Sequence, residues 1–154
     1  MIERPPTFIH ANALLIGETG LLLRGVPGSG KSALTLRLVE WAASRGFFAR
    51  LIGDDRVAVE NRSGRLIARP HPAVAGLIEM RGRGLVSVAF EPAGAILGVV
   101  DLEPPSGESH PRYPSPEADL TQICGVSLPR CAAAIRDAAV LEKMLHFIRN
   151  LSLK

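Results

Sequence analysis

The most specific chemical pattern in the chain is a glycine-rich stretch, Gly-Val-Pro-Gly-Ser-Gly-Lys-Ser, at positions 25–32. It satisfies the spacing Gly-x-x-x-x-Gly-Lys-Ser/Thr, with an apolar run before it and a helical pattern after it. In such a loop, backbone N–H groups surround phosphate oxygens, the lysine neutralises the outer phosphates and the serine hydroxyl binds magnesium. The pattern predicts a nucleoside triphosphate site made of Gly25, Val26, Pro27, Gly28, Ser29, Gly30, Lys31 and Ser32.

A magnesium site at such a loop also needs a carboxylate at the end of a second buried strand. Two positions qualify: Asp101 follows Ile-Leu-Gly-Val-Val, and the pair Asp54-Asp55 follows Arg-Leu-Ile-Gly. The strand pattern slightly favours Asp101. The adjacent aspartates, however, repel each other unless they share a cation or a proton, so one could serve the metal and the other accept a hydroxyl proton. A solvated turn before a hairpin is the alternative explanation for the pair.

Two further residues could take part in the chemistry, although each is weak evidence alone. Glu79 stands between an apolar segment and a glycine turn, where a carboxylate is poorly placed to serve solubility only. His10 opens the first strand of the apolar hairpin. A lone histidine in such a position is more often a capping or core residue than a catalyst.

The elements that must position these residues follow from apolar spacing and turn residues. Residues 13–24 read as a hairpin that feeds a buried strand, and the helix after the loop runs from Lys31 to about Ser44. A strand over 47–52 and a hairpin of 56–60 with 65–69 follow. Strand, glycine loop and helix therefore stand in the order that a phosphate-binding loop requires.

The later half of the chain predicts four more segments. A short helix over 73–78 precedes a glycine-arginine turn, and the apolar run 95–102 reads as a buried strand. Residues 103–118 are rich in proline and predict an exposed loop. A terminal helix is predicted over 131–151, where apolar residues recur at helical spacing.

Composition limits both the fold and the function. The chain has 154 residues, 47% of them hydrophobic, which predicts a single domain over 1–154. The order of strand, glycine loop and helix predicts an α/β fold for it: a P-loop nucleotide-binding fold with a central mixed sheet, an N-terminal β-hairpin and a C-terminal helix. The net charge of +3 comes mostly from scattered arginines, a pattern that argues against nucleic-acid binding. The sequence shows neither an apolar run of membrane-spanning length nor a signal peptide, so we expect a cytoplasmic protein without a membrane partner.

Taken together, these motifs resemble a known family, the bacterial HPr kinase/phosphorylases, over about residues 9–130. The resemblance is to their C-terminal catalytic domain, in the short form without the N-terminal domain. It rests on His10 at the matching distance before Gly25, on the loop itself, on Leu-Ile-Gly-Asp-Asp-Arg-Val-Ala-Val-Glu, and on Leu-Ile-Glu-Met-Arg-Gly-Arg-Gly. Further on, Gln-Ile-Cys-Gly-Val-Ser-Leu-Pro-Arg resembles the segment that leads to the family's last helices.

The resemblance implies a serine kinase that uses ATP and Mg2+ to phosphorylate the phosphocarrier protein HPr or a relative, and so regulates the sugar or nitrogen phosphotransferase system. Asp54 would be the general base for the seryl proton, and Asp101 would be structural. The metal ligands would be Ser32, Glu79 and Asp55, and the residues that line the transferred phosphate would be His10 and Lys31. Family members are commonly hexameric, which implies a homo-oligomer.

The chain departs from the family in three places. Ala33 replaces an acid that many members have after the loop serine, and several extra residues around Trp-Ala-Ala-Ser-Arg-Gly separate the loop from the aspartate pair. Cys-Ala-Ala-Ala-Ile-Arg-Asp stands where the family has the arginine loop linked to phosphorylase activity. The forward kinase reaction is therefore better supported than the reverse one. Two alternatives stay open: an ATP-binding regulatory module without efficient transfer, and a small-molecule P-loop kinase that uses Asp101 for magnesium.

Overall fold

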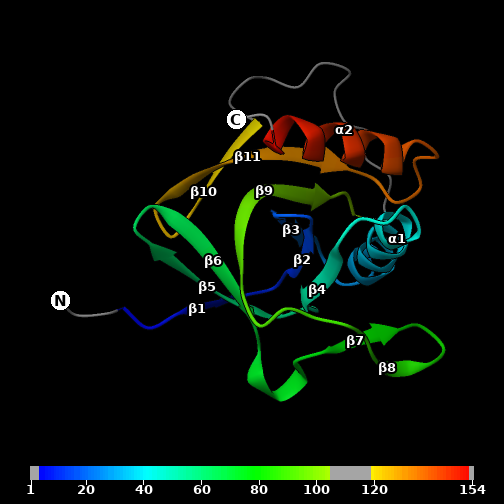
Figure 1. Ribbon diagram of the computed structural model, residues 1–154, viewed down its shortest axis with the longest axis horizontal. Coiled ribbons are helices and arrows are strands. Elements are labelled where there is room, and N and C mark those ends of the chain that lie inside the picture. Colours follow the sequence, from blue (N-terminus) through cyan, green and yellow to red (C-terminus); the bar gives the residue numbers. More distant parts are fainter. Residues whose placement is uncertain (1–3, 105–118, 153–154) are drawn as a thin grey trace.

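The fold is built on one mixed β-sheet (Figure 1). A computed structural model describes residues 4–104 and 119–152. In those ranges nine strands form the main sheet, in the order β1-β5-β6-β9-β3-β2-β4, with β11 beside β9 and β10 beside β11. They are β1 (Thr7–Ile9), β2 (Asn12–Ile16), β3 (Thr19–Arg24), β4 (Ala49–Gly53), β5 (Val57–Arg62), β6 (Arg65–Pro70), β9 (Gly94–Leu102), β10 (Leu120–Ile123) and β11 (Val126–Ala133).

The sheet is mixed because β9 runs parallel to both β3 and β11, while the other pairs are antiparallel. Its central strand β9 has nine residues, so the edge opposite β3 is long enough to pair first with β6 and then with β11. The β2–β3 hairpin and the mixed sheet confirm the fold class expected from the sequence.

Two apolar cores lie on the two faces of the sheet. Leu21 and Leu23 of β3 face the helices α1 (Lys31–Ser44) and α2 (Val140–Ser152). Leu22, between them, faces the other way into a core to which strands from both ends of the sheet contribute. The sheet therefore curves around that second core, which strand alternation separates from the helical one. Neither described helix combines the length and the apolar content needed to cross a membrane.

Two predicted helices differ from the structure. The segment 73–78 contains only a short 3-10 turn, Pro72–Val74, after which β7 (Leu77–Met80) pairs with β8 (Gly84–Ser87) in a separate hairpin. Gly76, at φ 76°, adopts the left-handed conformation that ends the turn. Glu79 is therefore a strand residue and not the end of a helix.

The terminal helix begins later than predicted. It spans Val140–Ser152, whereas residues 131–133 complete β11 and pair with β9, with Cys131 opposite Val100. Alanine has the highest helix propensity, but helix propensity is a small preference, and the parallel pairing with a buried strand outweighs it here. The predicted proline-rich loop 103–118 lies outside the described residues from 105 onward.

Gly20 is required by the close approach of two strands. A Cβ added to Gly20 would lie 2.1 Å from the carbonyl oxygen of Ala95, a backbone atom that cannot move without disturbing β9. We expect Gly20→Ala to lower the free energy of unfolding by about 2–3 kcal/mol in urea titrations. Gly98→Ala is the matched control: its Cβ would meet only side-chain ends of Leu151 and Phe147, which can rotate, so the loss should stay below about 1 kcal/mol. Equal losses in the two variants would contradict the backbone clash.

Candidate functional site

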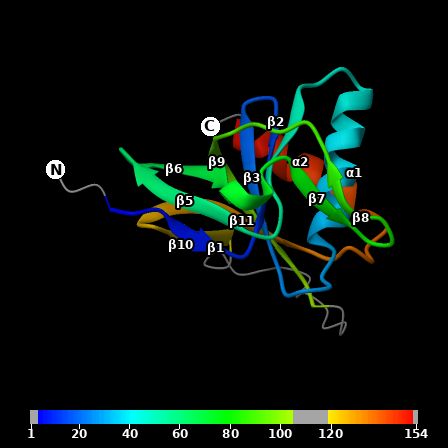
Figure 2. The same cartoon turned by 90° about the horizontal axis from the view of Figure 1, so that it is seen from below.

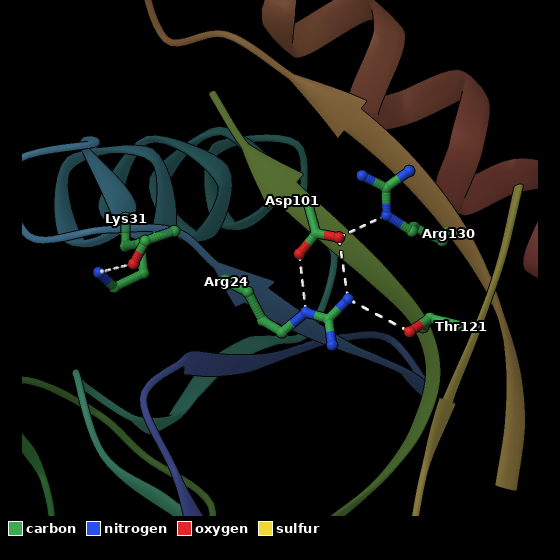
Figure 3. Close-up of polar contacts among 6 residues, drawn as sticks. Arg24, Lys31, Asp101, Thr121 and Arg130 are labelled. Carbon is green, nitrogen blue, oxygen red and sulfur yellow. Dashed lines mark hydrogen bonds and ion pairs between the residues drawn. The ribbon is translucent and has the colours of Figure 1, made fainter. Parts of the chain in front are cut away.

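The glycine-rich loop connects the end of β3 to the start of α1, as the sequence predicts. Gly30 caps the helix in a left-handed conformation, with φ 96°, and the first helical N–H groups follow it. A Cβ at Gly30 would also lie 2.4 Å from Cδ1 of Ile135, so the segment after β11 packs directly against the loop. Lys31 is 7% exposed, and its Nζ donates to the carbonyl of Gly25 at 2.8 Å. The lysine side chain therefore already lies across the loop that would surround the phosphates (Figure 3).

Asp54 is the carboxylate that the fold brings to this loop. It follows β4, is 8% exposed, and accepts a 2.6 Å hydrogen bond from the hydroxyl of Ser32 through Oδ1. The same oxygen accepts from Nδ2 of Asn12 at 2.8 Å, and Oδ2 accepts from the backbone N–H of Glu79 at 2.8 Å. These donors compensate for the removal of the carboxylate from water. The Asp54–Ser32 pair is thus a fixed feature of the site.

Sequence reasoning missed Asn12 and Thr35. Both are buried, at 0% and 1% exposure, and Nδ2 of Asn12 donates to Oγ1 of Thr35 at 3.1 Å. The signal was a single polar residue in the apolar strand of the hairpin and another on the apolar face of the helix. A buried polar side chain in such a position needs hydrogen-bonding partners, and these two satisfy each other beside Asp54.

The other predicted catalytic and metal-binding residues, His10, Asp55 and Glu79, are all exposed. His10 lies in the turn between β1 and β2, and Asp55 follows Asp54 with φ 61°. Glu79 is on β7, a strand that lies beside α1 (Figure 2). Within the described ranges no three His, Cys, Asp or Glu residues cluster closely enough to hold a metal. The hydroxyl oxygen of Ser32 and the carboxylate oxygens of Asp55 and Glu79 are ligands of the kind that suit magnesium, which commonly completes its shell with water and phosphate oxygens.

Asp101 belongs to a different cluster, on the sheet face opposite α1. Nε and Nη2 of Arg24 donate to its two oxygens at 2.7 and 2.9 Å, and Nε of Arg130 also donates to it (Figure 3). Burial alone would raise the pKa of Asp101, but the hydrogen bonds and charges of the two guanidinium groups outweigh burial and lower it. The carboxylate is therefore committed to two cations of the chain, which argues against the alternative that it holds magnesium.

Comparison with known proteins identifies the family. The family model described as HPr Serine kinase C-terminal domain matches residues 4–148. The chain belongs to this family. Among solved structures, the Hpr(Ser) kinase/phosphatase from Coxiella burnetii matches with a TM-score of 0.74 and 26% identity over 96% of this chain and 91% of that one. The resemblance noted in the sequence and the P-loop kinase fold are both confirmed.

Two curated relatives, both HPr kinase/phosphorylases, match half of the chain. The protein of Mycoplasma mycoides is 40% identical over 79 residues, which are 51% of this chain and 23% of that protein. The protein of Clostridium beijerinckii is 34% identical over 84 residues, or 54% and 26%. The matched region thus spans about a quarter of the length of these relatives.

In this chain, Asp101 should contribute to stability rather than to chemistry. We expect Asp101→Asn to lower the free energy of unfolding at pH 7 by about 1–2 kcal/mol, less than for a fully buried pair because the side chain is partly solvated. The pKa is depressed in the folded state, so the ionised carboxylate stabilises the fold above the ordinary value of 3.8, and this contribution is lost as pH falls through the folded pKa. Urea titrations should show a smaller difference in the free energy of unfolding between wild type and variant below pH 3.8 than at pH 7. A constant difference would contradict this role.

Proposed function

We propose that this chain is an ATP- and Mg2+-dependent serine kinase that acts on an HPr-type phosphocarrier protein and regulates the phosphotransferase system. The observation that carries the proposal is the buried Asp54 carboxylate at 2.6 Å from the Ser32 hydroxyl of the phosphate loop. A carboxylate in this position lies next to the end of a bound triphosphate, where an acceptor hydroxyl must arrive. Membership of the HPr kinase family supplies the substrate class.

In the proposed reaction, Lys31 exchanges the carbonyl of Gly25 for the outer phosphates of ATP. The seryl oxygen of the carrier forms a bond to the γ-phosphorus, the bond to the β-phosphate oxygen breaks, and ADP leaves. Asp54 accepts the seryl proton. Its Oδ1 already accepts two hydrogen bonds, whereas Oδ2 accepts one, from the Glu79 N–H, and keeps a lone pair for the hydroxyl. Most of the rate enhancement then comes from positioning and charge neutralisation.

The remaining residues have supporting roles in this proposal. Bound magnesium would neutralise the phosphate charge, and Ser32 would ligate it, with Asp55 and Glu79 providing further oxygens from the adjacent turn and strand. His10, in the turn before β2, would line the transferred phosphate together with Lys31. The exposure of His10, Asp55 and Glu79 leaves these three side chains accessible to a nucleotide and a protein substrate.

The direct test uses the purified chain, radiolabelled ATP, magnesium and the HPr-type proteins of its host. We expect label on a seryl residue of a carrier, recognised because phosphoserine is stable in acid whereas phosphohistidine is not. A reaction that releases phosphate from ATP but labels no seryl group would contradict the proposal. Such a result would favour the ATP-binding regulatory module, which the absence of an acid at Ala33 also suggests.

A further inference from the structure

Asn12 is the side chain through which strand β2 reaches the Asp54 carboxylate. It is fully buried, with 0% exposure. Nδ2 donates to Oδ1 of Asp54 at 2.8 Å and to Oγ1 of Thr35 at 3.1 Å, and it lies 3.5 Å from Oγ of Ser32. Oδ1 of Asn12 accepts from the backbone N–H of Asp55 at 2.8 Å. Both ends of the amide are engaged, and together they join a strand, a helix and a turn.

The sheet topology explains how this residue comes to the site. β2 is antiparallel to β3 and β4, so it begins at the edge where those two strands end and where the phosphate loop and Asp54 follow. Leu14 packs in the core beneath α1, and strand alternation places Asn12 on that same face. A buried amide on an apolar face costs desolvation energy unless its donors and acceptors are paired. The groups that pair it here are those of the proposed catalytic site.

We propose that Asn12 is a positioning residue for Asp54, an inference that rests on the proposed kinase function. The amide N–H fixes the plane of the carboxylate, so that Oδ1 faces α1 and Oδ2 is the oxygen left to accept the seryl proton. The amide oxygen accepts a hydrogen bond from the N–H of Asp55, the residue after Asp54, and so fixes the turn that carries the carboxylate. Asn12 touches neither reactant; it acts through the orientation of the base.

The turn after Asp54 needs this support. Asp55 has φ 61°, in the left-handed region that non-glycine residues seldom adopt. Oδ1 of Asn12 accepts a hydrogen bond from the N–H of Asp55, and the carbonyl of Asp55 accepts one from the N–H of Ala11 at 3.2 Å. Without the Asn12 amide, the part-buried N–H of Asp55 loses its acceptor and the Asp54 carboxylate can rotate about its terminal torsion. Transfer should then slow, whereas the loop that binds ATP is unchanged.

The experiment compares Asn12→Ala with Asn61→Ala, a matched control. Asn61 is exposed on β5, and its amide pairs with Cys124 and Gly64, away from the site. Single-turnover transfer from radiolabelled ATP to the HPr-type carrier should slow roughly 10- to 100-fold in Asn12→Ala. The Kd for ATP should stay within about threefold, and the control should match the wild type. If the alanine variant does not fold, Asn12→Ser, which keeps a small polar side chain, replaces it. This variant should also show slower transfer with a nearly unchanged Kd for ATP.

A double-mutant cycle separates positioning from a general effect on the fold. In an Asp54→Asn background, Asn12→Ala should change the rate by less than about twofold, because the group it positions is gone. Losses that multiply in the double variant would overturn the inference. An unaltered rate in Asn12→Ala, measured beside an active wild type, would overturn the inference alone. A wild type that transfers no phosphate would overturn the proposed function and this inference together.

Discussion

The variant Asp54→Asn is expected to lose about three orders of magnitude in kcat while its Kd for ATP changes by less than about threefold. Asparagine has nearly the same shape as aspartate, so Ser32 and Asn12 keep a neighbour of the same size. What is lost is the group that accepts the seryl proton. Rapid-quench assays with an HPr-type carrier and equilibrium binding of an ATP analogue would measure the two quantities separately.

The matched control for this change is Asp101→Asn, the same substitution at the other candidate carboxylate. Asp101 is bound by Arg24 and Arg130 on the far face of the sheet, so its loss should affect stability and leave kcat within about threefold of the wild type at a temperature where the variant is folded. The opposite pattern, with transfer lost in Asp101→Asn and kept in Asp54→Asn, would favour the small-molecule kinase and discard the role given to Asp54.

The choice between these two carboxylates shows what the sequence could not decide. Both follow an apolar run in the sequence, and the run before Asp101, which belongs to β9, is more apolar than the run in β4 that precedes Asp54. Val100 packs in the core beneath the helices, so strand alternation turns Asp101 to the opposite face, where the arginines lie. Which face carries the phosphate loop depends on the strand order in the sheet, and that order is set by pairings between distant residues.

Local signals were sufficient for the elements around the loop. The helix was predicted from Lys31 to about Ser44 and spans those residues, because apolar spacing, the glycine cap and Gly46 all mark the same boundaries. The same reasoning failed for 131–133, where partners on β9 determine the strand. Asn12 was missed for the same kind of reason: its partners Thr35 and Asp54 are distant in sequence and meet only through the pairing of β2 with β4.

Lys31→Met is the second change with a large expected effect, because it removes the charge that faces the outer phosphates while keeping most of the side-chain volume. In the structure Nζ is held by backbone carbonyls of the loop, at 2.8 Å from Gly25, and no carboxylate of the residues that the structure describes pairs with it. The positive charge is therefore available for a triphosphate. We expect the Kd for ATP to rise about 10- to 100-fold and kcat/KM to fall by about three orders of magnitude.

The fold should survive this change, because methionine fills the buried position of the lysine without leaving an unpaired charge. Thermal unfolding would check this, and Lys143→Met supplies the control: that lysine is on α2, is 65% exposed and pairs with Asp137. The control should leave both ATP binding and transfer unchanged. If Lys31→Met bound ATP as tightly as the wild type, the lysine would not contact the phosphates in the ground state. If transfer also persisted, the loop at 25–32 would not be the site of the reaction.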